Sequence, residues 1–107
     1  MNITRHPESD GEVRLALAGE LDMSTTDQLH QHVKHEFTGE RPRLRRLVVD
    51  LAQVSFCDST GLGALIEARN IARDHSAGFL VINPSCMTRR IMQVTGLLDL
   101  LTTTPPA

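Results

Sequence analysis

Leu47-Val48-Val49 is the stretch of sequence that decides the fold, and it lies within a segment from Leu44 to Leu51 that is predicted to be a buried central strand. A run of aliphatic side chains without polar alternation is typical of a strand that is covered on both faces. After it we expect a loop from Ala52 to Asp58, a helix from Ser59 to about Asp74, and a second buried strand over Gly78–Ile82. Two strands joined through a helix need a crossover connection, so this segment predicts a parallel sheet.

A β-hairpin is expected before this unit. Residues 3–6 predict a weak strand and residues 7–11, which contain a proline and a glycine, predict a turn. Residues 13–18 alternate between apolar and polar side chains, as a half-buried strand does. Gly19-Glu20-Leu21-Asp22 is expected to end that strand, which pairs with the first one at an edge of the sheet.

The first helix is expected to lie between the hairpin and the central strand. Ser24 followed three residues later by Asp27 resembles a capping box, which predicts a helix that runs to about Phe37. Gly39 and Pro42 are expected to end it. One face carries apolar side chains at helical spacing and should pack on the sheet: Leu29, Val33 and Phe37.

The C-terminal part predicts a third helix from about Ser85 to Thr95, ended by Gly96. Residues 97–101 predict a last short strand or a helical turn, and residues 102–107, which contain adjacent prolines, predict a flexible tail. The expected order is β-β-α-β-α-β-α-β. We therefore expect one α/β domain over residues 1–107, with its core at about 3–101. Its sheet should be mixed and mostly parallel, with helices mainly on one face.

Composition excludes several classes of function. The chain has 107 residues, a net charge of -2 and only 3% aromatic residues, which argues against binding to nucleic acid. The one basic run, Arg41, Arg43, Arg45 and Arg46, is interpreted as a solvated approach to a strand. No apolar run is long enough for a membrane helix, and Cys57 and Cys86 lack the spacing of a metal site. We expect a soluble cytoplasmic protein with reduced, buried thiols and no membrane contact.

The most informative stretch for function is Phe56-Cys57-Asp58-Ser59-Thr60-Gly61-Leu62-Gly63. Either Asp58 or Ser59 can cap the following helix by accepting hydrogen bonds from its free N–H groups. The cap does not explain the two glycines, since each costs about 1 kcal/mol relative to alanine within a helix. We interpret Gly61 and Gly63 as small residues that leave the hydroxyls of Ser59 and Thr60 accessible to a partner or a kinase.

Three other interpretations of the candidate residues are weaker. Gly61-x-Gly63 lacks the third glycine of a dinucleotide loop, because Ile66 stands in its place. Of the helix histidines His30, His32 and His35, only the last two are spaced to share a metal ion, and no third ligand is nearby. Ser59 as a hydrolase nucleophile would need an adjacent base, and no G-x-S-x-G turn is present. Phe56 and Met87 could contact a partner, although packing in the core is the default expectation for both.

Four segments together resemble the anti-sigma factor antagonists of the STAS class. These are Gly19-Glu20-Leu21-Asp22, Val49-Asp50-Leu51, Val54-Ser55-Phe56 and Asp58-Ser59-Thr60-Gly61-Leu62-Gly63. The expected order of elements agrees, and the resemblance covers about residues 3 to 101. The chain departs from the family where Thr102 and the residues after it stand in place of a longer terminal helix.

The resemblance implies a partner-switching protein without catalytic residues, cofactor or metal. In the family, the unphosphorylated antagonist binds an anti-sigma factor that is itself a serine kinase, and thereby frees a sigma factor for transcription, for example in a stress response. The kinase phosphorylates the serine after the aspartate, here Ser59, with Thr60 as a minor alternative, and a serine phosphatase restores binding. The implied partner-binding residues are Asp22, Asp58, Ser59, Thr60, Gly61, Leu62 and Gly63. We expect a monomer or weak dimer.

Two alternatives stay open at this point. One is a STAS scaffold, or a subunit of a transport complex, that binds a protein without control by phosphorylation. The other is a small hydrolase that uses Ser59.

Overall fold

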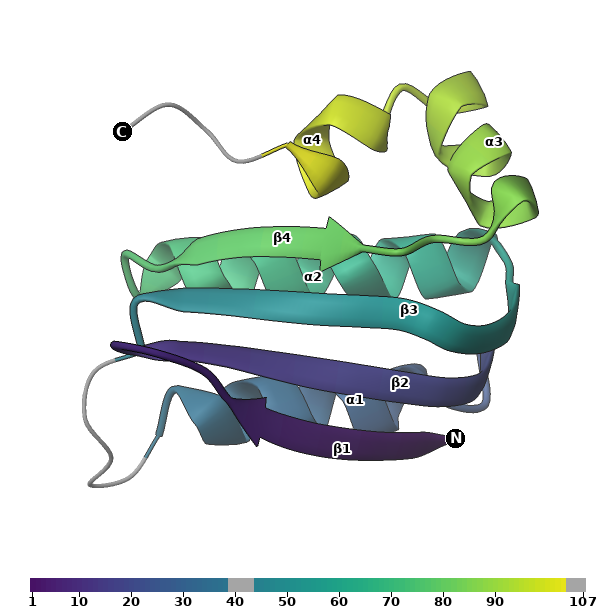
Figure 1. Ribbon diagram of the computed structural model, residues 1–107. Coiled ribbons are helices and arrows are strands. Elements are labelled where there is room, and N and C mark those ends of the chain that lie inside the picture. The colour runs from purple at the N-terminus through teal and green to yellow at the C-terminus, as the bar shows by residue number, and fades with distance from the viewer. Residues whose placement is uncertain (39–43, 104–107) are drawn as a thin grey trace.

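A four-stranded sheet organises the computed structural model, which describes residues 1–38 and 44–103 (Figure 1). The strands lie in the order β1-β2-β3-β4; β1 is antiparallel to β2, while β2, β3 and β4 are parallel to one another. The elements in chain order are β1 (Asn2–Pro7), β2 (Glu12–Leu21), α1 (Thr26–Glu36), β3 (Arg46–Cys57), α2 (Ser59–Asp74), β4 (Gly78–Ile82), α3 (Cys86–Val94) and α4 (Leu98–Thr102). The predicted α/β class and mostly parallel sheet are confirmed.

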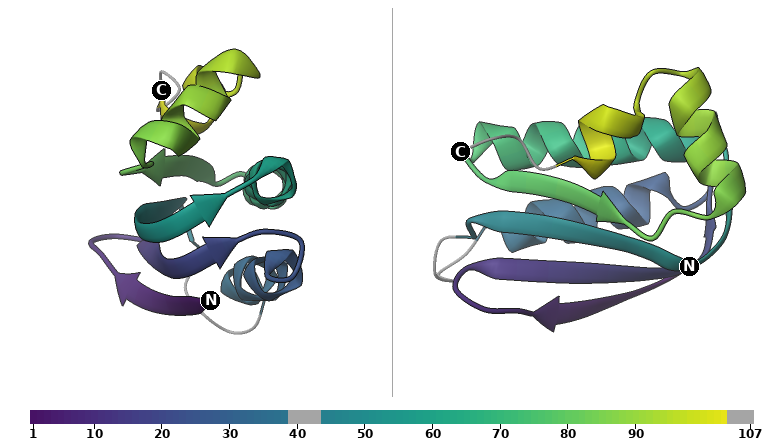
Figure 2. Two further views of the ribbon diagram at one scale, coloured as in Figure 1. Left: turned by 90° about the vertical axis from the view of Figure 1, so that its right-hand side faces the viewer. Right: turned by 45° about the horizontal axis from the view of Figure 1, so that its top comes forward.

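The helices lie mainly on one face of the sheet, as predicted. Figure 2 shows α1 and α2 side by side against that face, while α3 and α4 lie beyond the β4 edge. The core between the two layers is aliphatic, and its fully buried side chains include Leu15, Leu17, Leu29, Val33, Leu47, Val49 and Leu65. Val33 and Leu29 come from the stripe predicted for the first helix. Its third member, Phe37, is half-buried and its ring stacks on His75 at 4.8 Å.

The two central strands are longer than the sequence predicts. The loop expected from Ala52 to Asp58 is wrong, because β3 continues to Cys57 and pairs with β2 as far as Leu21. The sequence predicts that the preceding strand stops after Ala18, but β2 continues through Gly19 and Glu20 and ends at Leu21. Two register shifts, between Ala16 and Ala18 and between Gly19 and Glu20, interrupt the ladder without ending it. Such irregularities break the alternation of apolar side chains, so the pattern suggests a loop where the strands continue.

The capping box expected at Ser24 and Asp27 does not form. The helix α1 begins at Thr26, and the hydroxyl of Ser24 donates instead to Asp22 Oδ1 at 2.6 Å. The Asp22 N–H donates to Thr25 Oγ1 at 3.0 Å, which holds the turn before the helix. Helix α1 ends at Glu36, and the expected stop signals Gly39 and Pro42 lie outside the described residues.

The C-terminal part also differs from expectation. The last element is the short helix α4, so of the two predictions for residues 97–101 the helical turn is confirmed and the strand in the predicted order is wrong. Leu101 is fully buried, and Thr102 belongs to the helix rather than to a tail. The other residues of the expected tail, from residue 104 onward, lie outside the described part of the chain. Within that part, no helix is both long enough and apolar enough to cross a membrane.

Candidate functional site

The candidate site lies where the carboxyl ends of β2, β3 and β4 meet, at the right-hand end of the sheet in Figure 1. The loops that follow parallel strands all lie at the carboxyl ends of those strands, and ligands of open α/β folds bind at that end of the sheet. The turn after β2 begins at Asp22, the turn after β3 is the single residue Asp58, and the turn after β4 ends at Ser85. The fold therefore brings together segments that are more than 20 residues apart in the sequence.

Of the two caps that the sequence allows, Asp58 and Ser59, it is Asp58 that caps α2. Its backbone is extended, and its Oδ1 accepts hydrogen bonds from the Gly61 N–H at 2.9 Å and from Thr60 Oγ1 at 2.6 Å. The hydrogen bond from the Thr60 hydroxyl, followed by that from the Gly61 amide, lowers the pKa of Asp58 below its ordinary value. The carboxylate therefore stays charged beside the first turn of the helix.

The Ser59 hydroxyl is exposed at the first position of α2. No hydrogen-bond partner for it is found within residues 1–38 and 44–103. The neighbouring Thr60 hydroxyl is also exposed, but it donates to Asp58. Of the two hydroxyls, Ser59 is therefore the one that can react or bind without first breaking a bond.

The two glycines of the first turn have different roles. Gly61 is buried, and a Cβ on it would lie 2.3 Å from the Leu21 carbonyl oxygen and 2.9 Å from Cys57 Sγ. Its small size therefore lets the helix pack against the end of β2, and the prediction that it serves accessibility is wrong. Gly63 is exposed, and no atom would lie within 4 Å of an added Cβ. Leu62 is only 3% exposed. Gly61 and Leu62 are both predicted to bind a partner, but both are buried beneath the site and pack within the fold.

Asp22 lies beside Asp58 at the neighbouring strand end. Leu21 pairs with Cys57 in the ladder, and the Asp58 N–H donates to the Leu21 carbonyl oxygen at 3.4 Å. Asp22 Oδ1 accepts hydrogen bonds from the backbone N–H of Ser24 at 2.9 Å and from its hydroxyl. Two carboxylates therefore lie at neighbouring strand ends near the start of α2, and their charge would repel a further negative charge placed there.

Exposed apolar side chains lie at the same end of the sheet, and sequence reasoning did not single out one of them, Met23. Met23 is 77% exposed, Phe56 is 51% exposed and Met87 is 77% exposed. The default expectation of core packing for Phe56 and Met87 is thus wrong. Phe56 points outward because the register shift between Gly19 and Glu20 changes which β3 residues face the core. Apolar side chains around a polar centre are typical of a protein-binding surface.

Cys57 is a buried structural thiol. Burial, with the charge of Asp58 as a second cause, raises its pKa to about 11. Cys86, by contrast, is exposed in the first turn of α3, so the expectation that both thiols are buried is wrong for this one. Among the described residues, no three potential metal ligands cluster together.

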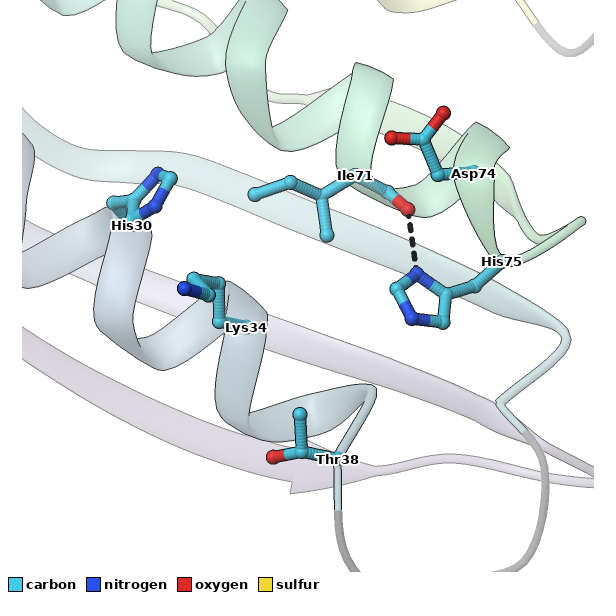
Figure 3. Close-up of a pocket in the computed structure, with 6 residues that line it drawn as sticks. All are labelled: His30, Lys34, Thr38, Ile71, Asp74 and His75. Carbon is cyan, nitrogen blue, oxygen red and sulfur yellow. Dashed lines mark hydrogen bonds between the residues drawn. The ribbon is translucent and has the colours of Figure 1, made fainter.

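The histidines of α1 do not converge on this site. His30 lines a surface hollow of about 240 Å³ between α1 and α2, together with Lys34, Thr38, Ile71, Asp74 and His75 (Figure 3). His75 hydrogen-bonds through Nδ1 to the Ile71 carbonyl oxygen at 2.9 Å. His32 and His35 are exposed elsewhere on the helix. The hollow is lined by the two covering helices and not by the strand ends.

Asp58→Asn is expected to reduce stability at neutral pH and to have little effect in acid. The substitution keeps a capping oxygen but removes the charge. Because the folded-state pKa of Asp58 is lowered, its charged form stabilises the fold above the unfolded-state pKa of about 3.9, and this contribution is lost as the pH falls through the folded-state pKa. Urea unfolding of both proteins at several pH values measures this. A difference in unfolding free energy that stays constant from about pH 7 to about pH 2 would contradict it.

Comparisons with known proteins address the family of this chain. Residues 4–102 match the family described as "Mlab, STAS domain". The anti-sigma-B factor antagonist of Listeria monocytogenes is 29% identical over 89 residues, which cover 83% of this chain and 75% of the relative. A STAS-domain containing protein of Pseudomonas aeruginosa is 30% identical over 96 residues, which cover 89% of this chain and 91% of the relative.

Solved structures share the fold. The anti-sigma factor antagonist SpoIIAA in its unphosphorylated form superimposes with a TM-score of 0.74 at 22% identity, over 94% of this chain and 86% of that one. The phosphorylated form of SpoIIAA from Bacillus superimposes with a TM-score of 0.67 at 22% identity, over 94% and 89% of the two chains. With the family match over nearly the whole chain, these findings place the protein: it belongs to the STAS domain family.

Proposed function

We propose that the protein is an anti-sigma factor antagonist controlled by phosphorylation of Ser59. In this proposal the unmodified protein binds an anti-sigma factor that has serine kinase activity, which frees a sigma factor for transcription. The kinase then phosphorylates Ser59 and the complex separates, until a serine phosphatase restores binding. The similarity to an anti-sigma-B factor antagonist, and to SpoIIAA in its unphosphorylated and phosphorylated forms, supports this proposal.

The single observation that carries the proposal is the environment of the Ser59 hydroxyl. It is exposed at the start of α2, beside a capping carboxylate, and it has no hydrogen-bond partner within the described chain. A hydroxyl with no structural task in the fold is available to a kinase. The proposed docking surface comprises Asp22, Met23, Phe56, Asp58, Ser59, Thr60 and Gly63, which gather at the carboxyl ends of β2 and β3.

Charge explains how the modification would act. A phosphate adds about 1.5 to 2 negative charges. The N-terminus of α2 stabilises an anion by about 0.3–1 kcal/mol, and the nearby carboxylates of Asp22 and Asp58 offset that gain, so the fold is kept. The penalty falls on the complex, where a desolvated phosphate would face the partner and these carboxylates. A change from 99:1 bound to 1:99 needs about 5.5 kcal/mol, which a buried double charge can supply.

Incubation with candidate anti-sigma factor kinases and ATP tests the proposal. We expect one phosphate on Ser59, identified by mass spectrometry of peptides. Ser59→Ala should abolish the transfer. Ser24→Ala should not, although Ser24 is also an exposed hydroxyl beside an aspartate of the same surface. Phosphate on Thr60 or Ser24 in the wild-type protein, with Ser59 unmodified, would overturn the assignment.

A second candidate is a STAS subunit of a larger complex whose binding is not controlled by phosphorylation. The family description "Mlab, STAS domain" favours it, because the family match covers residues 4–102 without specifying anti-sigma activity. The same surface would then bind its partner permanently. Tight binding of a partner by the wild-type protein, together with no phosphate transfer from any anti-sigma kinase, would favour this candidate over the first.

A further inference from the structure

Helix α3 has more apolar surface than the fold covers. Its inner face contains Thr88 and Met92, which are 4% and 0% exposed, and it lies closest to α4 among the other elements. Met87 and Val94 are 77% and 80% exposed. They are seven residues apart, which is about two helical turns, so both lie on one side of the helix. Figures 1 and 2 show that this helix stands beyond the β4 edge, clear of the sheet.

The same helix is locally basic. Arg89 and Arg90 are exposed, and neither forms an ion pair within the part of the chain that the structure describes. No aspartate or glutamate occurs between His75 and Leu98, although the whole protein has a net charge of -2. Arg90 lies three residues after Met87 and four before Val94, so it belongs to the same exposed stripe.

The stripe adjoins the surface proposed above. Ser85 caps α3 by accepting a hydrogen bond from the Thr88 N–H at 3.1 Å, at the carboxyl end of β4. Ser59 begins α2 at the carboxyl end of β3, the neighbouring strand. Met87 is therefore at the same end of the sheet as Ser59, and the α3 stripe extends this surface beyond the β4 edge.

We infer that α3 is a second docking surface, whose stripe of Met87, Arg90 and Val94 binds an apolar segment of the anti-sigma factor that also carries carboxylates. This inference rests on the proposed function and names a further contact with the same partner. The contact lies on a different helix from Ser59, so it adds affinity that phosphorylation does not remove directly.

Charge selects this occupant over the others. A second copy of the chain, packed by the same stripe, would bring arginines of like charge together, which is unfavourable in an interface. Binding to an anionic membrane surface typically uses clusters of about four to eight cations, and α3 has two. Nucleic-acid surfaces combine cations with aromatic side chains, and α3 has no aromatic residue. An acidic and apolar protein segment matches both properties of the stripe.

The test measures the affinity of variants of this protein for the anti-sigma factor that phosphorylates the wild type. Two variants should each weaken binding roughly tenfold or more: the double variant Met87→Gln/Val94→Gln and the single variant Arg90→Glu. Arg73→Glu is the matched control, because Arg73 is exposed in the last turn of α2 at the opposite end of the sheet. It should bind like the wild type. Wild-type binding should also weaken with added salt, and Arg90→Glu should reduce that dependence.

The outcomes separate the two proposals. If the wild-type protein binds the anti-sigma factor and both α3 variants bind it with unchanged affinity, the second docking surface is overturned while the proposed function stands. If the wild-type protein binds no anti-sigma factor, the proposed function fails and this inference fails with it. Co-sedimentation with anionic phospholipid vesicles that is lost in Arg90→Glu, without an effect on the protein partner, would overturn the inference in favour of a membrane.

Discussion

Gly61→Ala is expected to destabilise the fold by about 3 kcal/mol, the upper part of the range for overpacking. The added Cβ would lie 2.3 Å from the Leu21 carbonyl oxygen, 2.9 Å from Cys57 Sγ and 3.0 Å from Leu21 Cγ. The closest of these atoms belongs to the backbone of a paired strand, so it cannot move aside as the end of a flexible side chain does. Either α2 or the end of β2 has to shift. The free energy of unfolding in urea measures the loss.

Gly63→Ala is the matched control, two residues along the same helix. Nothing lies within 4 Å of its added Cβ, and alanine is favoured over glycine within a helix by about 0.5–1 kcal/mol. This variant should therefore be more stable than the wild type. The sign of the effect should differ between the two glycines. If Gly61→Ala were also stabilising, the close packing of α2 on the end of β2 would be contradicted.

Ser59→Glu is expected to weaken binding of the anti-sigma factor roughly 100-fold or more, because it places a fixed negative charge within the docking surface. Glutamate has less charge than a phosphate, so this effect is a lower bound on that of phosphorylation. Ser59→Ala should bind like the unmodified wild type and should not be released when ATP is added. Isothermal titration with the anti-sigma factor gives both affinities.

Asn70→Glu controls for the added charge. Asn70 is exposed on α2 near its C-terminal end, far along the helix from Ser59. It should leave the affinity within about twofold, since exposed charges at a distance are screened by salt. The electrostatic mechanism would be wrong if Ser59→Glu bound as tightly as the wild type, or if Asn70→Glu weakened binding as much as Ser59→Glu.

Much of the fold could be predicted because local patterns and tertiary structure agree. The apolar run Leu47-Val48-Val49 is buried within β3, and the helix after it begins at Ser59 with Asp58 as its cap. The cap could be narrowed to Asp58 or Ser59, because either side chain before an amphipathic segment can satisfy the free amides of the helix. The α/β class followed from the alternation of strands and helices.

Other features depend on contacts between distant residues, and no local pattern reveals them. The extension of β2 and β3 depends on pairing across register shifts. Glu36 is only 6% exposed because Arg5 on β1 donates to it, through Nε, at 2.8 Å and 3.0 Å, and nothing near Glu36 in the sequence indicates this partner. From sequence alone, Gly61 is likewise interpreted as a small residue that keeps nearby hydroxyls accessible, and only the position of Leu21 shows that it allows close packing.

The close contact between Gly61 and Leu21 has a kinetic consequence. It holds the first turn of α2, which contains Ser59, against a paired strand, so this part of the molecule already has its final shape before any partner arrives. A preorganised surface spares the complex the entropy of ordering loops. Association of the unmodified protein with its partner should therefore not be slowed by the ordering of this segment.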